Sequence, residues 1–109
     1  MAKSIMQTDC SRCYLTGSPY NLEEHHVMNG PFRKKAEKYG LKVKLSHSVH
    51  RWLHDTGDGR KFMYYLKAQA QYIFVNEYSY DKWMQEFKKD YSMYYVSDIQ
   101  KLYRKWIFE

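Results

Sequence analysis

The stretch LKVKLSHSVHRWLH, residues 41–54, joins a strand pattern directly to a helix pattern. Its first five residues alternate apolar and basic side chains, which is typical of a β-strand with one buried face. Ser46 is a suitable helix N-cap, so a helix is expected from about His47 to His54. The direction in which this helix leaves the strand decides where the histidines of the stretch lie.

A second strand is expected upstream, over residues 22–28, and the turn residues at 29–31 end it. A charged, helix-compatible segment follows at 32–39, and Gly40 is a natural stop for it. The two short strands could pair as a ribbon across this connection. Residues 1–9 are polar and are expected to be loose.

Helical patterns dominate the rest of the chain. The GDG at 57–59 is expected to break the chain, and a long helix is predicted from Arg60 to about Asn76. Ser79 is predicted to cap a further helix, and a last amphipathic helix is predicted to begin at Ser97. The apolar stripe of this last helix must be covered within the chain or by a second copy, so both a monomer and a homodimer are open.

Composition limits the class of protein. A chain of 109 residues is expected to form one domain, residues 1–109, with an α+β, mostly helical fold. No run approaches the roughly 20 apolar residues that a membrane span needs. The start of the chain lacks the apolar core of a secretory leader, so a cytoplasmic location is expected. A net charge of +6 favours polyanionic partners such as DNA.

All five histidines fall between residues 25 and 54. His50 and His54 are four residues apart, so on a helix they share a face and could bind one metal ion together. His25 and His26 are neighbours on a strand, where consecutive side chains point to opposite faces. Either one of them binds the metal while the other faces elsewhere, or the strand twists to bring both to the rim of one site.

The chemistry of imidazole suits two different roles here. A neutral imidazole is a ligand for Zn, Ni, Mn or Fe, and three such ligands leave positions open for water and substrate. An imidazole is also a suitable general base near neutral pH. A metal ion beside a phosphodiester and a base on the opposite side are parts that phosphodiester hydrolysis can use.

The order C-x2-C, a turn, EHHV, a loop, LKVKL and HRWLH resembles the HNH, or ββα-metal, endonucleases. The resemblance is closest to small HNH-like proteins of phages and prophages of Gram-positive bacteria. It implies a core of a two-stranded ribbon and one helix around a divalent ion, within residues 10–92, with residues 93–109 as an addition. The matching stretches are Thr16-Gly17, His25-His26, Arg33 to Leu41, Leu66 to Gln71 and Phe87 to Tyr91.

The resemblance also implies roles for individual residues. His26 would be the general base, and DNA would be the substrate. The ion would be Mg, Mn, Ni or Zn. The supporting residues would be Glu24 and His47, which lie outside the metal ligands. The ligands would be His25, His50 and His54, and the nucleic-acid contacts would be Arg33, Lys34, Lys35 and Arg51.

The chain departs from the family pattern at two places. The family's Asn, which helps to orient the base, would fall near Leu41. A second C-x2-C is replaced by Ser46 and Val49, so Cys10 and Cys13 either hold a structural zinc with other ligands or are two reduced thiols in a turn. These departures leave two alternatives to a nuclease. One is a nuclease-like fold that acts as a non-catalytic binding protein, such as a phage-encoded inhibitor of a host defence nuclease. The other is a DNA-binding module with a structural metal.

Overall fold

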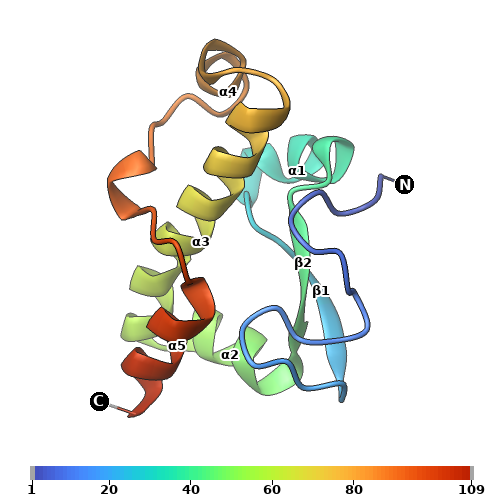
Figure 1. The fold of residues 1–109 in the computed structure, drawn as a ribbon, viewed down its shortest axis with the longest axis vertical. Helices are drawn as coiled ribbons and strands as arrows, with labels where there is room; N and C mark the ends of the chain where they lie inside the picture. Colours follow the sequence, from blue (N-terminus) through green and yellow to red (C-terminus); the bar gives the residue numbers. More distant parts are fainter. Residues whose placement is uncertain (1, 109) are drawn as a thin grey trace.

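A two-stranded ribbon and five α-helices make up the part of the chain that the computed structural model describes, residues 2–108 (Figure 1). The predicted α+β, mostly helical class is confirmed. None of the helices in this part is both long enough and apolar enough to cross a membrane. The elements in order are β1 (Leu22–His26), η1 (Gly30–Phe32), α1 (Arg33–Tyr39), β2 (Lys42–Ser46), α2 (His47–Asp55), α3 (Gly57–Glu77), α4 (Tyr80–Phe87), η2 (Ser92–Tyr94) and α5 (Ile99–Phe108).

The ribbon pairs β1 and β2 in antiparallel register, with His25 opposite Val43 and His26 opposite Lys42. β1 ends at His26, two residues earlier than predicted. The helix α2 starts directly after β2, as predicted, although the Ser46 side chain forms no capping hydrogen bond. The short path from β2 into α2 places the first turns of the helix beside β1.

The break between α2 and α3 is shorter than the sequence predicted. Thr56 alone separates the two helices, and its hydroxyl accepts a hydrogen bond from the Gly59 backbone N–H. Residues 57–59 therefore form the first turn of α3 and do not separate the two helices. Gly59 is needed because a Cβ there would lie 1.9 Å from the Trp52 carbonyl oxygen, so only glycine allows α3 to pack this closely on α2.

The helix α3 forms the centre of the core, and the other helices pack along it (Figure 1). Phe74 on α3 contacts Trp83 and Phe87 on α4, whose N-terminus is capped by Ser79 as predicted. Tyr103 on α5 packs against Trp52 of α2. The chain's own core therefore covers most of the apolar stripe of α5, and that helix begins two residues after the predicted start.

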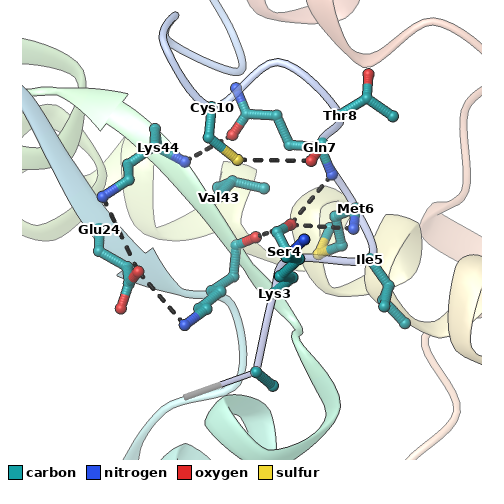
Figure 2. Close-up of a pocket in the computed structure, with 12 residues that line it drawn as sticks. Lys3, Ser4, Ile5, Met6, Gln7, Thr8, Cys10, Glu24, Val43 and Lys44 are labelled. Atoms are coloured by element: carbon teal, nitrogen blue, oxygen red, sulfur yellow. Dashed lines mark hydrogen bonds and ion pairs between the residues drawn. The ribbon is translucent and has the colours of Figure 1, made fainter.

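The prediction that the N-terminal segment is loose is wrong for residues 2–9, because hydrogen bonds hold this segment against the ribbon. The Ser4 hydroxyl donates to the Lys42 carbonyl, and the Gln7 side chain accepts from the Lys44 backbone N–H. Gly40 allows this approach, since a Cβ there would lie 2.1 Å from the Lys3 carbonyl oxygen. A pocket of about 430 Å³ remains between the segment and β2, and no histidine lines it (Figure 2).

Candidate metal centre

Three histidines gather where β1 meets α2. His25 comes from the ribbon, and His50 and His54 come from one face of α2. One ring nitrogen from each lies within 4.8 Å of the other two. The ring centroids of His25 lie 5.1 Å from His50 and 5.6 Å from His54. The structure thus brings together the three residues that the sequence singled out as metal ligands.

His25 has the environment of a metal ligand. Its side chain is buried, and its Nε2 is the buried side-chain nitrogen that has no hydrogen-bond partner within residues 2–108. Burial, followed by the charges of His50 and His54, lowers the pKa of His25 to about 3. The ring is therefore neutral at physiological pH and offers a lone pair. A buried polar atom without a partner is costly, and a metal ion would remove that cost.

Glu23 supports this cluster from outside. Its carboxylate oxygens lie 2.9 Å from Nδ1 of His50 and 2.9 Å from Nδ1 of His47. A proton on Nδ1 of His50 donates to the carboxylate and leaves Nε2 free as a ligand atom. Glu23 was not among the predicted site residues, although strand alternation places residues 23 and 25 on one face of β1.

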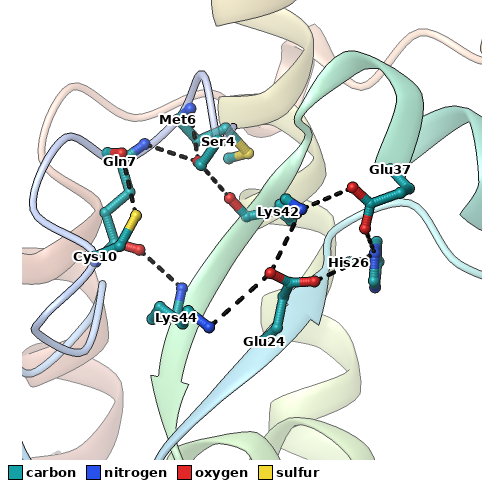
Figure 3. A network of polar contacts seen from close by, with 9 residues as sticks. All are labelled: Ser4, Met6, Gln7, Cys10, Glu24, His26, Glu37, Lys42 and Lys44. Atoms are coloured by element: carbon teal, nitrogen blue, oxygen red, sulfur yellow. Dashed lines mark hydrogen bonds and ion pairs between the residues drawn. The ribbon is translucent and has the colours of Figure 1, made fainter. Parts of the chain in front are cut away.

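The predicted contact between Glu24 and a ligand histidine does not form, because the Glu24 carboxylate pairs with Lys42 and His26 at the rim of the pocket that the three histidines line. Its carboxylate lies 3.4 Å from Lys42 Nζ and 3.8 Å from His26 Nε2 (Figure 3). The same alternation explains this position, since residues 24 and 26 share a face. Glu23, and not Glu24, therefore contacts a histidine of the three-histidine cluster.

Glu37 on α1 holds His26. Its Oε1 lies 3.0 Å from His26 Nε2, and its Oε2 accepts a 2.7 Å hydrogen bond from Lys42 Nζ (Figure 3). Lys42 first and His26 second lower the pKa of Glu37 to about 2, so the carboxylate is ionised. With Nε2 donating to Glu37, His26 Nδ1 is the nitrogen that can accept a proton.

Glu37 contacts His26, whereas the position near Leu41, where the family resemblance implies an Asn, offers no such contact. Leu41 is fully buried and has no side-chain hydrogen-bonding group. An ionised carboxylate orients an imidazole and stabilises its protonated form, as a buried Asp does for the histidine of a catalytic triad. No local sequence pattern predicts this contact, because Glu37 and His26 lie on different elements.

One pocket contains both histidines of the pair. It has a volume of about 250 Å³ and lies at the end of β1, where the ribbon gives way to the connection toward α1. Of the two arrangements that the sequence allowed, the structure has both side chains at the rim of one site. The pocket is lined by Glu24, His25, His26, Asn29, Arg33, His50 and His54.

The four predicted nucleic-acid contacts differ in their position relative to the pocket and in their ion pairs. Arg33 lines the pocket, and Lys34 is exposed beside it on α1. Lys35 points away, since its Nζ lies 3.0 Å from a Glu86 carboxylate oxygen on α4. Arg51 is exposed, but it pairs with the Asp55 carboxylate one turn later. Arg33 is therefore the best placed of the four for a phosphate at the pocket.

The two cysteines do not join a cluster of three metal-ligating side chains within residues 2–108. Cys10 is exposed and Cys13 is buried. Burial raises the pKa of Cys13, but hydrogen bonds from Thr16 and from the Ser46 backbone outweigh it and lower the pKa overall. His47, predicted as a supporting residue, pairs with Glu23 and not with either cysteine.

Comparisons with protein-family models, with curated proteins and with solved structures found no match for this chain. Three imidazoles, a histidine held by a carboxylate and an arginine lie at one pocket, and side chains of these types could serve as metal ligands, a base and an anion contact.

Proposed function

We propose that this chain is a metal-dependent endonuclease of the HNH type that hydrolyses DNA phosphodiester bonds. One observation carries the proposal: the unpartnered Nε2 of buried His25 lies in a three-histidine cluster that shares its pocket with His26. A purely structural metal site would fill four positions with protein ligands and would not need a base beside it. Three ligands with an adjacent imidazole fit a catalytic site better.

His25, His50 and His54 would hold the ion, and Glu23 would keep His50 in the ligating tautomer. When bound, a divalent ion supplies positive charge that neutralises a phosphate oxygen and the leaving oxygen. The three rings are suited to this task because burial keeps His25 neutral and the other two remain open to the pocket.

His26 would act as the general base. Its Nδ1 takes a proton from water as the water oxygen forms a bond to phosphorus and the bond to the leaving oxygen breaks. The imidazolium that results donates from Nε2 to the Glu37 carboxylate, 3.0 Å away. Arg33 at the pocket rim would bind a phosphate oxygen and orient the backbone.

A plasmid-nicking assay in Mg, Mn, Ni or Zn tests the proposal, together with elemental analysis of each variant. His26→Ala should keep its metal and lose cleavage by about a hundredfold or more, since general bases contribute about 10²–10⁴. His50→Ala should lose the metal and the cleavage together. Wild-type protein that binds metal but nicks no DNA, or a His26→Ala variant that nicks equally well, would show that this mechanism is wrong.

A further inference from the structure

A second group of metal-ligating side chains lies beside the three-histidine cluster. Glu24, His26 and Glu37 each offer one ligand atom, and these atoms lie within 4.8 Å of one another. The Nε2 atom of His26 is 3.0 Å from Glu37 Oε1 and 3.8 Å from Glu24 Oε1. Carboxylates and imidazoles are common ligands for divalent ions such as Mn²⁺. By geometry alone, this second group could hold an ion, and His26 would then be one of its ligands.

The ammonium group of Lys42 already lies between the two carboxylates. Its Nζ is 2.7 Å from Glu37 Oε2 and 3.4 Å from Glu24 Oε2 (Figure 3). The lysine side chain is only 7% exposed, so its charge faces these carboxylates and not water. Burial alone would lower the pKa of Lys42, but the hydrogen bonds and charges of Glu37 and Glu24 outweigh burial and raise that pKa. The buried lysine is therefore a cation.

The four side chains form a closed ring of contacts, because each glutamate divides its two oxygens in the same way. In both Glu24 and Glu37, Oε1 faces His26 and Oε2 faces Lys42 (Figure 3). Lys44 approaches this ring from outside, but its Nζ is 3.9 Å from Glu24 and its side chain is 35% exposed. Exposed ion pairs are weak. Lys42 is therefore the cation that the ring is built around.

Lys42 changes the charge that a metal ion would meet in the ring. The two carboxylates and the ammonium carry one net negative charge, whereas the carboxylates without the ammonium would carry two. Attraction for a divalent ion grows with that charge, and a fixed ammonium beside the same oxygens repels the ion. A lysine ammonium also donates hydrogen bonds to the carboxylates and leaves the imidazole nitrogen uncoordinated.

We infer that Lys42 is a positioning residue that occupies the cation position between Glu24 and Glu37 and keeps a second metal ion away from His26. The inference rests on the proposed function, in which His26 is the base. An ion in the ring would take Nε2 of His26 from Glu37 and would turn the base into a ligand. Many enzymes that cleave phosphodiesters use two ions. Lys42 instead limits this pocket to the one ion of the three-histidine cluster.

Counting bound ions tests the inference without measuring cleavage. Each protein is titrated with Mn²⁺, which favours carboxylate ligands over thiolates, and electron paramagnetic resonance of the free ion gives the number bound. Lys42→Met removes the charge and keeps a long apolar side chain. Lys44→Met is the matched control, because it removes the same charge from a more exposed position on the same strand. Lys42→Met should bind one more Mn²⁺ per chain than the wild type, and Lys44→Met should bind the same number as the wild type.

Two further variants locate the additional ion. Lys42→Arg keeps the positive charge and should keep the wild-type count. Lys42→Met/Glu37→Gln lacks one carboxylate of the ring and should return to the wild-type count.

Equal counts in Lys42→Met and the wild type, with unchanged circular dichroism, would overturn the inference. If Lys42→Met does not fold, Glu37→Gln decides: an ion that the wild type binds and this variant loses would show that the position is not blocked, and an unchanged count would support the block. A Lys42→Met variant that gains an ion, in a chain that never nicks DNA, keeps the exclusion of an ion by Lys42 and loses the proposed hydrolysis.

Discussion

Mild acid should destabilise the metal-free protein, because buried His25 resists protonation in the folded state. Its folded-state pKa is about 3, against 6.5 for the ordinary side chain. Between these values the unfolded chain binds a proton that the folded chain does not. The free energy of unfolding is therefore highest above pH 6.5 and falls as the pH is lowered toward 3.

The size of the effect follows from the two pKa values. Each pH unit between them costs about 1.4 kcal/mol, so His25 would remove about 5 kcal/mol in total and about 2 kcal/mol by pH 5. Stopping at pH 5 separates the histidine contribution from that of the carboxylates. The stabilisation by an ionised carboxylate such as Glu37 is lost only below its ordinary pKa of 4.5. His54 contributes in the same direction, since burial also lowers its pKa.

The assay is urea unfolding in EDTA at pH 7.5 and pH 5, followed by tryptophan fluorescence. Wild-type protein should lose about 2 kcal/mol between the two values, a fall of about 1–2 M in the urea midpoint. His25→Leu fills similar space without a titrating group and should lose much less. His47→Gln, which removes an exposed histidine, should retain most of the wild-type loss. Equal losses in the wild type and His25→Leu would refute the reasoning.

Three further variants test the support of the site and the fold. Glu23→Gln should weaken metal affinity about 10- to 100-fold in competition with a chromogenic chelator, since outer partners of ligand histidines have effects of this size. Glu37→Gln should keep the metal content of the wild type and lower plasmid nicking at least tenfold, because His26 loses its carboxylate partner. Gly59→Ala should lower stability by about 1–3 kcal/mol in thermal unfolding, whereas Gly57→Ala, with open space around its Cβ position, should not.

Periodicity predicted the parts of the site that lie on single elements. The spacing of His50 and His54 required only that residues 47–54 be helical, and they are. The alternation in the strand also separated His25 from His26. The same rule, applied one step further along β1, assigns Glu23 to the side of His25 and Glu24 to the side of His26. The sides of β1 on which Glu23 and Glu24 lie could therefore be predicted from strand alternation alone.

Contacts between elements could not be predicted in this way. Glu37 reaches His26 only because α1 folds back over the ribbon, and no local pattern specifies that return. The short link between α2 and α3 could not be predicted from local patterns either. Glycines usually indicate a break, but Gly59 is part of a helix because tertiary packing against Trp52 leaves no room for a side chain.

The two faces of β1 together favour hydrolysis over binding alone. A binding module could use the three-histidine cluster as a structural metal site, but that role does not explain the second contact of Glu37, with His26. That carboxylate also pairs with Lys42, which is buried, and a buried lysine charge is costly unless it is paired. A carboxylate that contacts both a lysine and a histidine, at the rim of the three-histidine cluster, supports the proposed role of His26 as the base. The adjacent pair at 25 and 26 is thus best explained as a ligand and a base that meet in one pocket because β1 ends there.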